Sequence, residues 1–222
     1  MTSAQMLTLL QGTNMRRYVV RPLFSALLLL GAPISHASSP LEFRGLAIGS
    51  TEEEFRTRYP ELRCDDPQKK AAAEKGRFKD FWQRKQTEAD LFCGTVISDR
   101  APPARLAKMA GQVATNFEFD FVRNQLMHAS ASLPPPAFDR LVAALSAKYG
   151  APDRKETESF QSKTQGKVAN TILYWTRGDA TIRVSKYAAG LDMTSYSLAS
   201  NDYRKEVDRR HAARAKEVAR GL

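Results

Sequence analysis

The chain has little of what usually marks an active site. Its 222 residues include two cysteines and three histidines. Neither His128 nor His211 has a histidine, cysteine or carboxylate beside it at the spacing of a metal site. The phosphate-binding, dinucleotide-binding, zinc-protease and serine-hydrolase motifs are also missing from the sequence. These absences predict a protein without catalysis, cofactor or bound metal.

Long apolar runs and a biased composition are also absent. Hydrophobic residues make up 42% and charged residues 26% of the chain, with 12 glycines and 11 prolines. This is the composition of an ordinary globular protein, which excludes collagen, coiled coils and multi-span membrane proteins. The one conspicuous apolar run, residues 23–32, has about half of the ~20 residues that a membrane-spanning helix needs.

The N-terminal region is typical of a secretory signal. Three arginines precede the apolar run, no acidic residue does, and a proline and small residues follow it. This order predicts a signal peptide over residues 1–37, with cleavage between Ala37 and Ser38. The first fourteen residues are atypical of such a signal, so Met15 is the expected start of translation. The alternative is an uncleaved membrane anchor, which the short apolar run disfavours.

Removal of residues 1–37 would leave a basic protein, with 31 basic and 24 acidic side chains. No cysteine lies near the cleavage site to carry a lipid, so we expect a soluble protein in the periplasm or outside the cell. The acidic partners there are protein faces, cell-wall polymers and anionic lipid headgroups rather than nucleic acid. A surface that is simply well solvated is the plainer interpretation, because no block of the sequence concentrates the positive charge.

Cys64 and Cys93 are expected to form a disulfide, because an even cysteine count in an oxidising compartment usually indicates a bridge. A bridge across a loop of about thirty residues stabilises a fold by ~3–4 kcal/mol in the chain-entropy description. The charged insertion that it encloses, residues 64–93, has few large apolar side chains and cannot form a core alone. A redox-active thiol pair is the alternative, but such pairs usually have C-x-x-C spacing.

After a short strand-like or extended segment over residues 43–49, the boundary residues predict a helix. Ser50 and Thr51 each stand three residues before a glutamate, which gives two overlapping capping boxes. Pro60 disfavours helix in the residue before it, so the helix should end near Tyr59. A further helical turn is expected over residues 104–110.

Antiparallel strands should follow and complete a first unit over residues 38–133. Three phenylalanines alternate with polar residues over 116–122, a period of two that predicts a strand with one apolar face. We expect these rings to form core rather than a ligand platform. Glu118 and Asp120, on the opposite face, are expected to face water. Residues 126–133 should pair with this strand as a hairpin.

A second unit over residues 134–200 repeats the order of helix and strands. An apolar stripe at helical spacing runs from Phe138 to Tyr149, and Gly150 ends the helix. Residues 154–169 fit either another strand or a loop. Further strands are expected at three places: 171–175, 180–187 and 193–199.

The tail, residues 201–222, has the composition of a charged helix. Its apolar seam is narrow and consists of four residues: Tyr203, Val207, Ala215 and Val218. This pattern predicts a loosely docked or protruding helix with a solvated surface. Contact with a partner or with an anionic surface is the alternative, although membrane-surface helices have a stronger apolar face.

Two groups of residues could support catalysis. His128 could act as a general base for Ser130 or Ser132, which share its face of the predicted strand. Two carboxylate pairs could hydrolyse a glycoside: Asp65 with Asp66, and Glu118 with Asp120. A satisfied histidine and solvated carboxylates are the commoner case for such residues, so a cell-wall hydrolase is only the alternative of a different class.

Two short motifs carry a resemblance to known families. Gly49-Ser50-Thr51 begins the first helix, and Lys148-Tyr149-Gly150-Ala151-Pro152 ends the second. A helix with such ends followed by a β-meander resembles the SmpA/BamE-like fold of small envelope lipoproteins. Two such units in tandem resemble the beta-lactamase inhibitor protein arrangement. The resemblance implies a non-enzymatic protein-binding module, although the lipid-bearing cysteine of the lipoproteins is missing here.

Together these features predict an exported α+β protein with two tandem helix-plus-antiparallel-meander units and a charged C-terminal helix. Its expected role is to bind an envelope protein. A cell-wall polymer or an anionic lipid surface is the alternative ligand. Tyr174, Trp175 and Tyr187 are the candidate binding residues on an open sheet face. Since Tyr174 and Trp175 point to opposite faces of their strand, one of them should be exposed unless it is covered.

Overall fold

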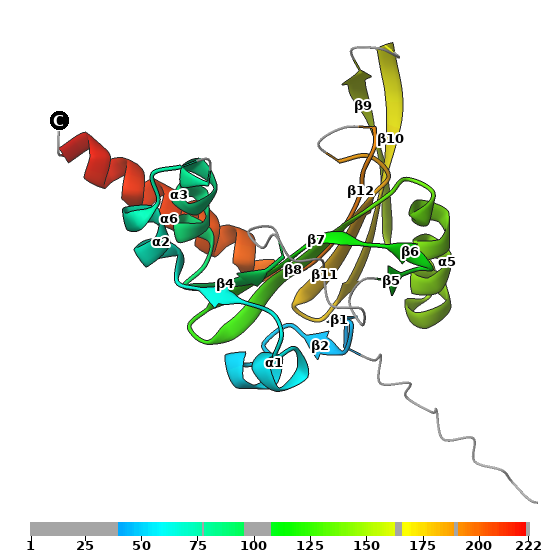
Figure 1. The fold of residues 1–222 in the computed structure, drawn as a ribbon. Helices are drawn as coiled ribbons and strands as arrows, with labels where there is room; N and C mark the ends of the chain where they lie inside the picture. The colour runs from blue at the N-terminus through cyan, green and yellow to red at the C-terminus, as the bar shows by residue number, and fades with distance from the viewer. Residues whose placement is uncertain (1–39, 77, 96–107, 163–165, 189–190, 221–222) are drawn as a thin grey trace, which may run out of the picture. The chain divides into compact units, whose positions relative to one another are not determined.

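The computed structural model describes residues 40–76, 78–95, 108–162, 166–188 and 191–220 (Figure 1). These residues form an α+β fold with five helices and a large antiparallel sheet. The expected signal peptide, its cleavage site at Ala37 and Ser38, and the start at Met15 lie outside the described residues. Within the described residues, no helix combines the length and the apolar character that crossing a membrane requires.

The large sheet has eight strands in the order β3-β4-β7-β8-β12-β11-β10-β9. Each strand pairs antiparallel with its neighbours, and β8 lies beside β12, so strands from the first and last parts of the chain meet inside one sheet. The strands are β3 (Cys64–Asp65), β4 (Leu91–Gly94), β7 (Thr115–Val122), β8 (Gln125–Leu133), β9 (Arg154–Ser162), β10 (Gly166–Arg177), β11 (Ala180–Ser185) and β12 (Thr194–Ser200).

Two short hairpins accompany the sheet. One joins β1 (Glu42–Phe43) to β2 (Leu46–Ala47), and the other joins β5 (Lys108–Met109) to β6 (Gln112–Val113). The second corrects the helical turn expected over residues 104–110. Residues 104–107 lie outside the described residues, whereas Lys108 and Met109 are extended and pair with the strand that follows. Pairing with a neighbouring segment overrode the local helical preference of this short stretch.

The first helix, α1 (Glu52–Arg58), begins and ends where its boundary residues predict. The Thr51 hydroxyl accepts from the Glu54 N–H at 3.2 Å, and the Glu54 carboxylate accepts from the Thr51 N–H at 2.7 Å. Backbone bonds from Gly49 and to Ser50 then join the entry of α1 to Leu126 of β8 at 2.9 and 2.8 Å. The helix is therefore attached directly to the sheet.

One face of the sheet holds the main hydrophobic core. The three phenylalanines of β7 are at most 1% exposed, which confirms their expected role in the core. The Phe119 ring lies 4.8 Å from that of Phe55 on α1 and 5.3 Å from that of Phe43 on β1, measured between centroids. The apolar stripe of α5 (Ala137–Tyr149) joins the same core. Both predicted helices thus cover this face.

The other face carries the insertion and the C-terminal helix. The insertion forms α2 (Pro67–Ala73) and α3 (Lys79–Glu88), and the expected Cys64–Cys93 disulfide joins β3 to β4 at its base. Trp82 of α3 is 2% exposed and packs edge-on against Phe92 of β4, so the insertion borrows apolar surface from the sheet. Helix α6 (Asn201–Arg220) packs against α3, β8 and β12 (Figure 1).

Candidate functional site

A buried ionic cluster lies between the sheet and the helices on this second face. Asp120 of β7 is fully buried rather than facing water, which corrects the expectation for that strand. The ammonium of Lys85 on α3, itself 2% exposed, lies 3.1 Å from both carboxylate oxygens of Asp120. It also lies 2.8 Å from the Glu118 carboxylate and 2.9 Å from that of Glu88. Period two placed both acids on one face, but only the tertiary fold covers that face.

The charges of the cluster reinforce one another. Burial alone would lower the pKa of Lys85, but attraction from Asp120, Glu118 and Glu88 outweighs it and raises that pKa above its ordinary value. Burial would likewise raise the pKa of Asp120, yet Lys85 and His128 hold it below the ordinary value. Both groups are therefore charged at neutral pH, and their pairing joins α3 to the sheet beside the apolar contact of Trp82 with Phe92.

His128 of β8 and Tyr203 of α6 complete the shell around Asp120. The His128 Nδ1 atom lies 2.9 Å from the carboxylate, and the Tyr203 hydroxyl donates to the same oxygen at 2.8 Å. The two rings stack with centroids 5.0 Å apart and 3° between their planes. Burial and the nearby Asp120 raise the pKa of Tyr203. His128, which the sequence analysis considered as a base for Ser130 or Ser132, instead contacts an aspartate and a tyrosine.

Further polar contacts hold the first half of α6. Arg210 bonds Asp90 at 2.8 Å and Glu206 at 2.8 Å, and His211 lies 3.2 Å from the Thr87 hydroxyl. Hydrogen bonds from Arg209 and Arg210 lower the pKa of Glu206 to about 2. Of the predicted apolar seam, Tyr203 and Val207 are half-buried whereas Ala215 is exposed; the Val218 side chain lies outside the description. The helix is docked by polar bonds more than by its seam.

Beyond these helices, the same face presents an ordered row of side chains. The row has one residue from each of β9, β10, β11, β12, β8 and β7, and each residue lies directly opposite the next in the strand pairing. Residues that lie opposite one another in a sheet share a face. From the edge inward the row is Arg154, Tyr174, Arg183, Ser197, Ser130 and Glu118. We call these six residues the cross-sheet row. Tyr174, Arg183, Ser197 and Ser130 are all partly exposed, so this part of the face is open to solvent.

Tyr174 is held rigidly in the row. The guanidinium carbon of Arg154 lies 3.9 Å from the centre of its ring, and its hydroxyl donates to the Glu156 carboxylate at 2.7 Å. A cation over an aromatic face and a hydrogen bond at the ring's end restrict the side chain on both sides. Among the three candidate binding residues, Tyr174 alone lies in the cross-sheet row.

The other two candidate binding residues have structural contacts. Trp175 is fully buried on the opposite face, and its Nε1 donates to the Gly150 carbonyl at 2.9 Å, which corrects its assignment as a surface anchor. Tyr187 is half-buried, and its backbone accepts from and donates to the Asn170 side chain at 3.0 and 2.9 Å. Asn170 is itself 4% exposed, so the Tyr187 backbone satisfies polar atoms of a buried side chain.

A groove of about 520 Å³ lies between this open face and α6. Tyr174, Arg183 and Ser197 form part of its sheet wall, and Tyr203 and Arg204 part of its helix wall. Its lining residues come from three strands, β10, β11 and β12, and from helices α3 and α6, so no local motif could reveal it. The signal for Arg183 was its place in an alternating strand, whereas Lys85 and Arg204 stand among many similar charges and gave no signal.

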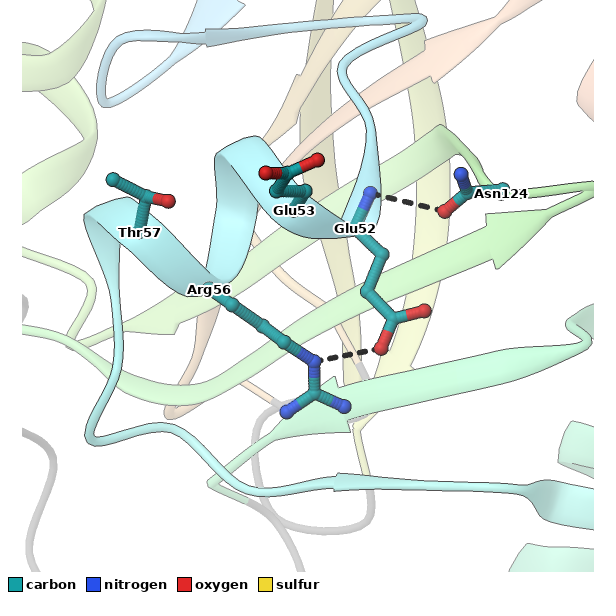
Figure 2. A pocket seen from close by; sticks show the side chains of 5 residues that line it. All are labelled: Glu52, Glu53, Arg56, Thr57 and Asn124. Atoms are coloured by element: carbon teal, nitrogen blue, oxygen red, sulfur yellow. Dashed lines mark hydrogen bonds and ion pairs between the residues drawn. The ribbon is translucent and has the colours of Figure 1, made fainter.

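A second, shallower depression lies beside α1 and the β7–β8 turn (Figure 2). Figure 2 shows Glu52 directed toward Arg56, while Glu53 and Thr57 point elsewhere. The Arg56 Nε atom lies 2.6 Å from the Glu52 carboxylate. The Glu52 N–H also donates to the Asn124 side chain at 3.3 Å. Glu52 is thus bonded to Arg56 through its side chain and to Asn124 through its backbone, and the second bond attaches α1 to the turn.

The predicted carboxylate pair in the insertion also has local roles. Asp66 caps α2 by accepting from the N–H groups of Gln68 and Lys69, and Asp65 pairs with Arg63 at 3.0 Å. Within the described ranges, no three histidine, cysteine or acidic side chains are grouped as metal ligands would be. Comparison with protein-family models, with curated proteins and with solved structures found no match to this chain.

Proposed function

We propose that this protein is an exported accessory protein of the bacterial envelope that acts by binding another protein and not by catalysis. The observation that carries the proposal is the cross-sheet row, in which Tyr174 is immobilised by Arg154 and Glu156 on a partly exposed face. Tyrosine and arginine are enriched among residues that dominate binding energy at protein interfaces. A side chain that is already immobile loses little entropy when a partner covers it.

The proposal includes a tandem organisation of the SmpA/BamE-like kind. One unit would comprise α1 with β4, β7 and β8, and the other α5 with β9 to β12. In support, each helix packs on the same apolar face, and each set of strands is contiguous in the sheet order. The units would then share one sheet through the β8–β12 pair, which leaves the cross-sheet row running across their junction.

An anionic lipid surface is a weaker alternative ligand. Among the described residues, Val113 is the only large hydrophobic side chain classed as exposed, at 56%. Proteins that bind membrane surfaces place several apolar side chains into the headgroup region. A polar face with a tyrosine and arginines therefore favours a protein partner over a lipid surface. A cell-wall polymer is the other alternative ligand, and the experiment below distinguishes it from a protein.

The proposal can be tested by photo-crosslinking in the native cells. The full-length chain would carry p-benzoylphenylalanine in place of Tyr174, an aromatic substitution on the open face. A matched control would carry it in place of Ala144, an exposed residue of α5. We expect one protein adduct of fixed mass from position 174 and none from position 144.

Three outcomes of this experiment contradict the proposal. Equal adducts from both positions would indicate random collisions, and adducts containing only glycan or lipid would indicate the alternative ligands. No adduct at position 174 would show that the face binds nothing in the cell. The mass of the isolated chain tests the predicted export at the same time, because cleavage of the signal peptide after Ala37 would leave Ser38 as the N-terminal residue.

A further inference from the structure

The groove beside α6 contains arginines whose charge is not used within the described structure. Most neighbouring cations are paired: Arg210 with Asp90 and Glu206, Arg209 with Glu206, Lys205 with Asp202, and Arg154 with Glu156. Arg183 and Arg204, which line the groove from β11 and α6, make no hydrogen bond or ion pair with any described residue. Two guanidinium groups therefore face one groove without a partner among these residues.

Two acids, Glu88 and Asp208, line the same groove, and neither forms an ion pair with Arg183 or Arg204. The Glu88 carboxylate already pairs with Lys85 at 2.9 Å and with Arg84 at 3.5 Å. Asp208 lines the groove one turn after Arg204, yet the two form no ion pair in the structure. Arg183, Arg204 and Asp208 are thus the charged lining residues that form no ion pair with a described residue.

The rest of the lining is rich in hydroxyl and amide groups. Ser197 lies directly opposite Arg183 in the β11–β12 ladder, and Thr181 and Asn201 bond to each other at 2.9 Å nearby. Arginine presents a planar set of donors that matches a carboxylate with two parallel hydrogen bonds. Hydroxyl groups beside it supply further donors to such a ligand.

We infer that the groove receives an acidic segment of the protein partner, with carboxylates bound by Arg183 and Arg204 and the chain lying across Tyr174. This inference rests on the proposed function and names the chemistry of its partner. The charge complementarity argues for it, because an acidic segment satisfies both guanidinium groups. It also accords with the excess of basic over acidic residues that removal of residues 1–37 would leave, 31 to 24.

The test extends the crosslinking at position 174. The double variant Arg183→Gln with Arg204→Gln removes both charges from the groove. Its matched control, Arg140→Gln with Lys167→Gln, removes two exposed charges outside the groove. We expect the groove variant to lower the adduct yield by at least about tenfold, since charged contacts of this kind are worth a factor of ten or more. The control should leave the yield unchanged.

Mapping the adduct by mass spectrometry supplies a second readout. The crosslinked partner peptide should contain aspartate or glutamate, and changing those residues to lysine should restore binding to an Arg183→Glu, Arg204→Glu variant. An adduct that forms equally well in the glutamine variant, or a mapped peptide without acidic residues, would overturn the inference and leave the proposed function intact. Absence of any protein adduct from the unchanged groove would instead overturn the proposed function. Circular dichroism of each variant checks that it is folded.

Discussion

The two faces of the eight-stranded sheet are stabilised in different ways. One face packs the phenylalanines of β7, Trp175 and other apolar side chains under α1 and α5. The other face holds α3 and α6 through Lys85, Asp120 and the groups around them, and then continues as an open polar surface. Burial of apolar area tolerates small shifts in position, whereas buried charges require particular partners at particular distances. The first face therefore supplies stability, and the second fixes where α6 and the groove wall lie.

The largest expected effect compares two consecutive residues that point to opposite faces. Trp175→Ala should lower the free energy of unfolding by about 4–5 kcal/mol, because it leaves a cavity in the core and an unpaired Gly150 carbonyl. Tyr174→Ala should lower it by less than about 1 kcal/mol, because that side chain is partly exposed. Urea unfolding measures both. Similar losses would show that the open face is in fact part of the core.

A slightly smaller loss is expected from the ionic face. Lys85→Met removes the cation and leaves Asp120 buried without its main partner, which should cost about 4 kcal/mol. Lys79→Met, at an exposed site on the same helix, is the control and should be nearly neutral. Thermal unfolding compares the two variants. If Lys85→Met were also neutral, the cluster would not hold α3.

The disulfide should contribute somewhat less to the free energy of unfolding, and its loss should affect mainly the insertion that it closes. Replacing Cys64 and Cys93 by serine should cost about 3 kcal/mol, because the unfolded chain regains the freedom of the loop. Hydrogen exchange should rise first in α2 and α3, which the bridge closes, and least in α5. Chemical reduction of the unchanged protein should reproduce the same pattern. Uniform loss of protection would show that the insertion and the main core unfold as one unit.

The smallest effect is a local dependence on pH. The pKa values of Asp120 and Glu206 are lowered in the folded state, the latter to about 2, so their contribution is present above about pH 4.5. It is lost as the pH falls toward 2. Protection of α6 amides, corrected for intrinsic exchange, should therefore decline over this range by about 1 kcal/mol.

Glu206→Gln is the control for the pH effect. It should reduce protection of α6 already at pH 7, because Arg209 and Arg210 lose their shared acceptor. As the pH is lowered, the protection of α6 amides in this variant should decline less than in the unchanged protein. Identical acid profiles in the two proteins would assign the effect to other groups.

Much of the secondary structure followed from local signals. The capping box at Thr51, the alternation of β7, the stripe of α5 and the charged tail all predicted elements that the structure contains. Each is a pattern of neighbouring residues, which short-range geometry constrains. The undecided segment 154–169 was harder because its apolar residues are sparse; it forms β9 and the start of β10.

The candidate site followed from local signals only in part. Tyr174 was identified because alternation along a strand separates the two faces. Trp175 was named as a candidate as well although it is core, since alternation shows that the two residues differ in face but not which face is covered. Asp120 was expected in water for the same reason. Lys85 and Arg204 belong to helices with many charges, and nothing local distinguishes them.

The sequence by itself determined the α+β class, the boundaries of α1, β7, β8 and α5 to within a residue or two, the charged C-terminal helix and the disulfide pairing. Only the tertiary structure decided that β8 joins β12, that α3 and α6 cover Asp120, and that Arg183 and Arg204 meet in one groove. The physical reason is range. Capping and periodicity act over a few residues, whereas strand order, coverage of a face and the pairing of charges depend on segments brought together across the whole chain.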